Sequence, residues 1–197
     1  MSEIKSALEL ALEKTEDVQG DPKSVEMHEH KQTGKRLVTK VIDGESIDLA
    51  AELGRYEGDK RRWVEQGFFE VLVMNVKLPS DELELERIRR LQKGFQAVIR
   101  DKEQLRELFR QLDSLLGQYV ENRREMIEGV RRQFEGRIRQ KEQELQRQTG
   151  TAVRLDPASD PEFTQYLREN MNRLQQQYTG VLDQVKEQLN LLFDAGR

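Results

Sequence analysis

The segment from Asp81 to Thr149 contains no proline and repeats an apolar residue every three or four positions. That spacing is typical of a helix that packs an apolar seam against a second helix in a coiled coil. At 1.5 Å per residue, a continuous helix over this segment would be roughly 100 Å long, so it would have to project from any globular part. The seam residues are Ile88, Leu91, Phe95, Val98, Leu105, Phe109, Leu112, Leu116 and Tyr119.

A second long helix is predicted over residues 161–194, after a loop over residues 150–160. The pair Asp160-Pro161 is typical of a helix start, because aspartate caps the first turn and proline fits its first position. The predicted apolar seam of this helix runs from Phe163 through Val181 to Leu192. Because the loop is short, the two helices should be antiparallel. We therefore predict an all-α fold, an elongated antiparallel coiled-coil hairpin built on one long central helix, with about five helices in total.

The expected organisation has three parts. Residues 1–44 form N-terminal amphipathic helices, residues 45–80 form a third helix and its turn, and residues 81–197 form the hairpin with helices over 81–149 and 161–194. Two segments leave an alternative open, because residues 35–42 and 68–78 have a composition that suits a strand as well as a helix.

Apolar and charged residues each make up 36% of the 197 residues. Ordinary globular domains contain about 45–50% apolar and about 25% charged residues, so a single thick core is excluded. The chain has no cysteine, which excludes disulfides and thiolate metal sites. The N-terminus lacks a signal-peptide pattern, and the most apolar run, Val71 to Val76, is too short for a membrane helix. We expect a cytoplasmic protein that does not insert into membranes.

The only two histidines, His28 and His30, lie two positions apart. On a helix these side chains would point about 200° apart, so a shared metal would require extended backbone. A solvated polar helix is the simpler interpretation. No glycine-rich phosphate loop or nucleophile motif accompanies them. The sequence therefore predicts no enzymatic activity, no cofactor and no metal site.

Several glycines lie inside predicted helices, among them Gly67, Gly117, Gly129 and Gly136. Each costs about 1 kcal/mol relative to alanine in a helix interior. Gly67 occupies a seam position, which favours a close approach of two helices there. Tolerated sequence drift is the alternative interpretation of these glycines.

Basic residues are concentrated in residues 87–147, where 16 basic and 10 acidic side chains give a net charge of +6. Arginine suits contacts with phosphate groups, so nucleic-acid or ribosome binding is the alternative function. Interleaved glutamates instead favour a solvated helix flank. The candidate nucleic-acid contacts are Arg89, Arg90, Arg123, Arg124, Arg131 and Arg132.

The leading hypothesis is a non-enzymatic coiled-coil scaffold, adaptor or assembly protein that acts through helix–helix interactions. A two-helix seam buries little surface, so we expect protein partners and self-association as a dimer or a larger oligomer. The candidate contact residues on the N-terminal helix and on the long seam are Ile4, Leu8, Ala11, Leu12, Leu105, Leu112 and Tyr119.

The segment Ser2 to Thr15, together with Gly34-Lys35-Arg36-Leu37 and the Leu78-Pro79 turn, resembles a family of uncharacterised bacterial proteins. These proteins share the charged amphipathic start and a helical body. The resemblance is most specific over the first 15 residues. It implies a domain of unknown function, and no activity or site residue follows from it.

Overall fold

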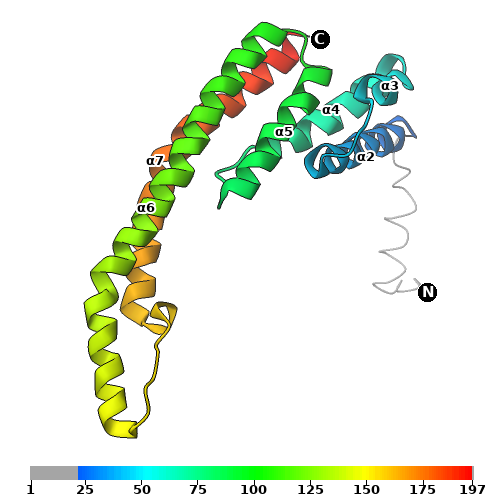
Figure 1. The fold of residues 1–197 in the computed structure, drawn as a ribbon. Coiled ribbons are helices and arrows are strands. Elements are labelled where there is room, and N and C mark those ends of the chain that lie inside the picture. The colour runs from blue at the N-terminus through cyan, green and yellow to red at the C-terminus, as the bar shows by residue number, and fades with distance from the viewer. Residues whose placement is uncertain (1–21, 197) are drawn as a thin grey trace, which may run out of the picture. The chain divides into compact units, whose positions relative to one another are not determined.

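A computed structural model describes residues 22–196, and in that range every regular element is helical (Figure 1). The predicted all-α class is confirmed. The N-terminal contact residues Ile4, Leu8, Ala11 and Leu12 lie outside the described residues. The chain divides into two units, and the boundary along the sequence lies between Leu72 and Val73.

The first unit contains α2 (Pro22–Asp43), α3 (Leu49–Gly54) and most of α4 (Gly58–Asn75). α2 begins at Pro22, and proline suits the first position of a helix. The predicted helix over residues 45–80 is divided, because α3 ends at Gly54 and α4 begins only at Gly58, where the backbone takes a positive φ of 55° that suits glycine. Of the two segments that suited a strand, residues 35–42 are helical within α2. Residues 68–75 are helical within α4, and residues 76–78 follow it without regular structure.

The two longer helices of this unit, α2 and α4, run in the same direction. Three ion pairs join them in rising order, Lys23 to Asp59, Glu26 to Lys60 and Lys31 to Glu70, with nitrogen–oxygen distances of 3.7, 2.7 and 3.2 Å. Both helices also bury apolar side chains, which are Leu37, Val38 and Val41 on α2 and Val64, Phe68 and Leu72 on α4.

Two glycines allow these helices to cross at close range. A Cβ atom added at Gly34 would lie 2.0 Å from the carbonyl oxygen of Val64, and one added at Gly67 would lie 2.1 Å from that of Lys31. The close approach predicted at Gly67 is therefore confirmed. Gly34 is its counterpart on α2.

The second unit begins at Val73 and contains α5 (Glu82–Val98), α6 (Lys102–Thr149), a short 3-10 helix η1 (Pro157–Ser159) and α7 (Pro161–Asp194). Asp81 caps α5 by accepting the N–H of Glu84 at 2.9 Å. The Glu84 carboxylate in turn accepts the N–H of Ser80 at 2.7 Å, and this hydrogen bond, assisted by Lys77, lowers the pKa of Glu84 to about 2.

The predicted single helix over residues 81–149 is wrong, because the chain reverses direction at residues 99–101. Asp101 caps a new helix by accepting the N–H groups of Glu103 and Gln104. The ammonium group of Lys102 donates to the carbonyl oxygens of Gln96 and Ile99 at the end of α5. Side chains thus satisfy both helix ends at the break. Lys102 stands between the seam residues Val98 and Leu105, which are seven positions apart. The longest helix is α6, at 48 residues or about 70 Å.

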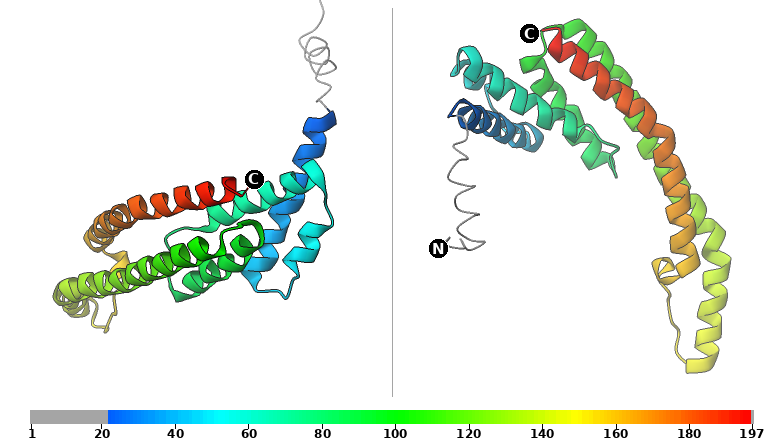
Figure 2. Two further views of the ribbon diagram at one scale, coloured as in Figure 1. Left: turned by 90° about the horizontal axis from the view of Figure 1, so that it is seen from above. Right: turned by 180° about the vertical axis from the view of Figure 1, so that it is seen from behind.

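Both α5 and α7 pack antiparallel to α6 (Figure 2). The rings of Phe95 and Phe109, one on α5 and one on α6, lie 5.5 Å apart. On the other pair, Tyr119 lies 5.2 Å from Tyr178, and near the far end Phe134 lies 5.6 Å from Phe163. α7 begins at Pro161, at that far end.

The apolar face of α7 departs from the predicted heptad spacing. Val181 is 44% exposed, whereas Leu182, Val185, Leu189 and Phe193 are buried. Buried and half-buried apolar positions follow steps of four, four and three, an 11-residue repeat with about 3.67 residues per turn. That repeat stays on one side of a nearly straight helix, which explains why Leu182 and Phe193 replace Val181 and Leu192 at the most buried positions.

Candidate functional site

Three predicted contact residues lie inside the second unit. Leu105, Leu112 and Tyr119 are at most 2% exposed, and they belong to α6, which contacts both α5 and α7. The expectation that they face a partner is therefore corrected, because the reversal at residues 99–101 brings α5 of the same chain back along α6.

The candidate surface lies farther along α6 and α7, in what we call the outer segment, residues 120–181. Here α6 is accompanied by α7 and the connection between them, without α5. Its core is small and consists of Val130, Phe134, Ile138 and Phe163, with Met126, Leu155 and Leu167 partly buried against it. Phe134 also lies 5.8 Å from the ring of Tyr166, which remains 37% exposed.

Apolar side chains of the outer segment are incompletely covered. Met126 and Ile127 on α6, and Met171 and Leu174 on α7, are all only half-buried. Corresponding seam positions beside α5, such as Leu105 and Leu116, are almost completely buried. The outer segment therefore retains apolar surface that a further helix could cover.

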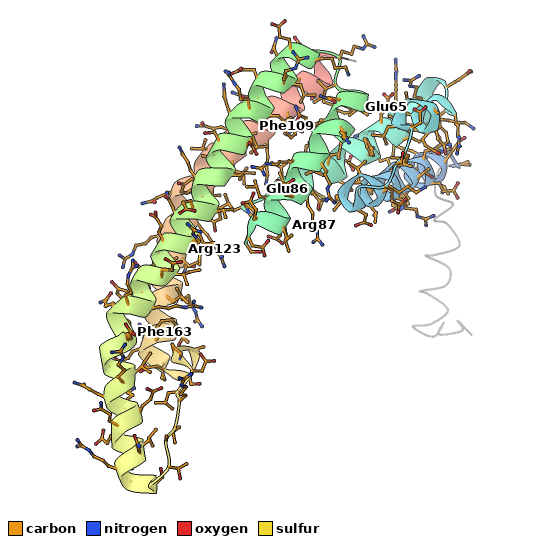
Figure 3. The ribbon with its side chains drawn as sticks, in the orientation of Figure 1. Glu65, Glu86, Arg87, Phe109, Arg123 and Phe163 are labelled. Carbon is orange, nitrogen blue, oxygen red and sulfur yellow. The ribbon has the colours of Figure 1, made fainter. Side chains whose placement is uncertain are left out.

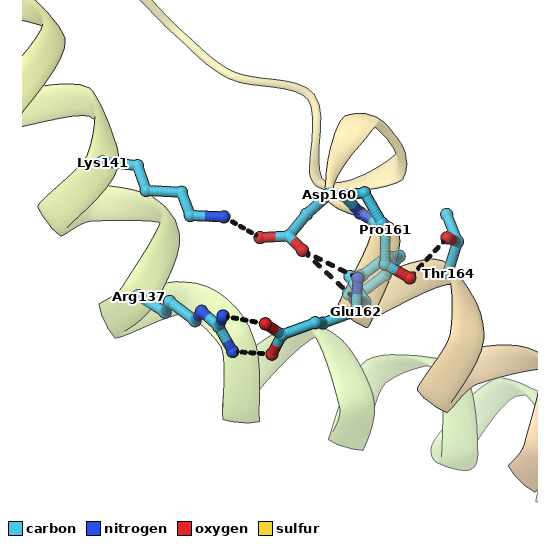
Figure 4. A network of polar contacts seen from close by, with 7 residues as sticks. Arg137, Lys141, Asp160, Pro161, Glu162 and Thr164 are labelled. Atoms are coloured by element: carbon cyan, nitrogen blue, oxygen red, sulfur yellow. Dashed lines mark hydrogen bonds and ion pairs between the residues drawn. The ribbon is translucent and has the colours of Figure 1, made fainter.

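Polar contacts fix the end of this segment (Figure 4). Asp160 accepts the N–H groups of Glu162 and Phe163 as the predicted cap of α7, and Lys141 of α6 donates to its second oxygen at 2.6 Å. The Lys141 ammonium holds the pKa of Asp160 below its ordinary value. Beside it, the Arg137 guanidinium forms a two-pronged ion pair with Glu162. These contacts bind the start of α7 to α6 at one defined register.

Four of the six candidate nucleic-acid arginines are engaged within the chain. Arg89 pairs with Glu82, Glu86 and Asp113, and the carboxylates of Asp113 and Glu86 raise its pKa. Arg123 lies on α6 (Figure 3), and its side chain donates to the backbone carbonyl of Ser80.

Arg124 forms an ion pair with Glu121 at 2.6 Å, and Arg90 also has a partner in the structure. These four arginines therefore support the interpretation of a solvated helix flank.

The remaining two, Arg131 and Arg132, line a groove between α6 and the connection after it. The groove has a volume of about 620 Å³, and Arg139, Arg154, Ile138 and Pro157 also line it. We call it the arginine groove. Arg154 belongs to the loop and was not among the sequence candidates, because only the folding back of residues 150–157 brings it beside α6.

The two histidines lie in α2 and do not form a paired site. The imidazole of His30 packs against Tyr56 and Trp63, with ring centroids 5.7 and 6.1 Å away, and its Nδ1 atom lies 2.8 Å from the carbonyl oxygen of Glu26. His28 instead contacts Gln32. Over residues 22–196, no group of three or more histidine, aspartate or glutamate side chains is arranged to hold a metal ion.

Similarity to known proteins is confined to the level of a family. No helix among the described residues is long and apolar enough to cross a membrane. No curated protein and no solved structure matches the chain. The model of the Family of unknown function (DUF6657) matches residues 50–190, well over half of the sequence, and this range includes α4, α5, α6 and nearly all of α7. The chain therefore belongs to this family of unknown function.

Proposed function

We propose that the protein is a non-enzymatic helical scaffold or assembly protein whose outer segment binds by helix packing. The observation that carries the proposal is the contrast in burial along α6. Seam residues next to α5 are almost fully buried, whereas Met126 and Ile127 are half-exposed where only α7 accompanies α6.

The occupant that we propose for this surface is a second copy of the chain. Two helix pairs that join through their apolar edges form a four-helix arrangement, which buries both edges at once. Charges of both signs alternate along the segment, as in Glu121, Arg124, Glu128 and Arg131. A symmetric partner would therefore meet opposite as well as like charges, which avoids overall repulsion.

The carboxyl groups with a shifted pKa are held in ion pairs and hydrogen bonds within the chain. A general acid or base works best when its pKa lies near the working pH, which requires an upward shift for a carboxyl group. Among the described residues, the carboxyl groups with a shifted pKa are Glu26, Glu84, Glu107, Asp160 and Glu162, and each is shifted downward by a basic side chain or a backbone N–H group.

Light scattering coupled to size-exclusion chromatography tests the proposal. We expect the wild-type protein to have the mass of a dimer or a larger oligomer, with the fraction of oligomer rising with concentration. The double variant Ile127→Glu/Leu174→Glu should shift the mass to that of the monomer while far-ultraviolet circular dichroism stays unchanged. The matched control is Leu191→Glu, since Leu191 is 64% exposed on α7 and lies outside the outer segment.

A wild-type protein that stays monomeric with full helicity at high concentration would refute self-association through this surface. The control variant becoming monomeric as readily as the double variant would also contradict it. We also propose that the protein is located in the bacterial cytoplasm, and fractionation of the source cells would test this.

A further inference from the structure

The arginine groove carries three arginines that have no partner among the residues that the structure describes. Within residues 22–196, the side chains of Arg131, Arg132 and Arg154 form no hydrogen bond or ion pair. Other arginines of the second unit, such as Arg110 and Arg137, pair with a glutamate three residues away or on the facing helix. The three unpaired guanidinium groups are brought together from α6 and from the loop, and all line one groove.

The glutamates that share the groove are largely occupied elsewhere. Glu135 pairs with Arg139, and Glu142 accepts the backbone N–H of Leu155 at 2.8 Å. The charge of Arg131, Arg132 and Arg154 is therefore left to interact with an anion that comes from outside the chain.

We infer that the arginine groove binds an acidic peptide segment that carries an aliphatic side chain, supplied by a partner protein. Guanidinium groups pair with carboxylates through two parallel hydrogen bonds, which suits an acidic side chain. Ile138 and Pro157 line the same groove and provide apolar surface for the aliphatic group. The inference rests on the proposed function as a scaffold and specifies the chemistry of one partner.

Two features favour a peptide over a nucleic acid. Single-stranded nucleic acids bind through aromatic side chains that stack on bases, and no aromatic residue lines this groove. Glu128, Glu135 and Glu142 are interspersed with the arginines and would repel a phosphate backbone that carries a charge at every nucleotide. A peptide can place its few carboxylates only where the arginines lie.

Fluorescence anisotropy with a labelled synthetic peptide tests this inference on the full-length protein. The probe is a short glutamate-rich peptide with leucine at helical spacing. Replacing Arg131, Arg132 and Arg154 by glutamine should weaken binding about tenfold, as expected for the loss of several partly exposed ion pairs. The matched control replaces Arg87, Arg106 and Arg168, three exposed arginines outside the groove, by glutamine. This control should bind the peptide as the wild type does.

Three results would overturn the inference. They are an equal loss in the control variant, undiminished binding of a peptide with glutamine in place of glutamate, and tighter binding of single-stranded oligouridylate than of the peptide. Undiminished binding of a peptide with alanine in place of leucine would refute the role of Ile138 and Pro157. Ile127 and Leu174 do not line the groove, so the Ile127→Glu/Leu174→Glu variant should still bind the peptide. Loss of self-association and loss of peptide binding are therefore separate outcomes.

Discussion

Replacing Gly34 by alanine should force α2 and α4 apart and destabilise the first unit. The added Cβ atom would lie 2.0 Å from the carbonyl oxygen of Val64 and 2.7 Å from the backbone nitrogen of Phe68. Both neighbours are backbone atoms, so no side-chain rotation can relieve the contact. The helices would have to separate by about 1 Å to bring the carbon to the 3.0 Å below which such contacts essentially never occur.

The expected cost follows from two opposing terms. Inserting a methyl group into a closely packed site costs about 1–3 kcal/mol, and we take about 3 kcal/mol because the obstacle is backbone. Alanine has a helix propensity about 1 kcal/mol better than glycine. The net loss should therefore be about 2 kcal/mol, a large fraction of the stability of so small a core.

Trp63, the only tryptophan, lies on α4 beside His30 and reports on this packing. Urea unfolding followed by its fluorescence should show a midpoint about 1 M lower in Gly34→Ala than in wild type. Gly67→Ala should act in the same way through its contact with Lys31. The double variant should lose less than the sum, because one separation of the helices relieves both contacts.

The matched control is Gly136→Ala in α6, where a Cβ atom would meet nothing within 4 Å. This substitution should raise the stability of the second unit by up to about 1 kcal/mol, measured by far-ultraviolet circular dichroism in urea. The two glycine-to-alanine changes thus have opposite predicted signs. A midpoint for Gly34→Ala equal to or above that of wild type would refute the close crossing of α2 and α4.

Three further perturbations probe the second unit. Asp101→Ala removes the cap of α6 and should cost about 1 kcal/mol in urea unfolding; an unchanged midpoint would show that the break at residues 99–101 does not depend on the cap. Phe134→Ala should lower the stability of the outer segment by about 3 kcal/mol. Amide hydrogen exchange over this segment should become faster, and unchanged exchange rates would contradict the small core around Phe134. The pKa of Glu84 is lowered to about 2 from an ordinary value of 4.5, so its stabilising contribution is complete above pH 4.5 and is lost as the pH falls toward 2. Glu84→Gln should therefore weaken the pH dependence of unfolding between these values, and an unaltered pH dependence would count against the hydrogen bond with Ser80.

The proposed binding surfaces rest on burial in the structure, whereas the predicted ones rested on apolar spacing in the sequence. Sequence spacing placed Leu105, Leu112 and Tyr119 on a seam open to partners, and the structure buries all three within the unit. What remains available is the outer segment, where the same spacing continues but fewer helices provide cover. An apolar repeat shows that a residue faces another helix, and it does not show whether that helix belongs to the same chain.

The sequence by itself determined the helical class, most helix ends and the limit on core size. These features are local, since they depend on apolar spacing, on proline and on caps such as Asp160-Pro161 and Gly150, which ends α6 with a positive φ of 71°. The close packing at Gly67 could also be predicted, because a glycine at a seam position lets the backbone of a second helix approach where a side chain would block it.

Tertiary structure alone decided where the long apolar stretch folds back on itself. Asp101 starts α6 by accepting the N–H of Gln104, but in the sequence this pair looks like any polar stretch on a helix surface. The helix breaks there because the reversal buries Phe95 and Ile99. The same reversal determines which seam residues are covered, and the loop after Gly150 determines that Arg154 joins Arg131 and Arg132. Contacts between residues far apart in the chain depend on the free energy of the whole packed unit, which local spacing does not specify.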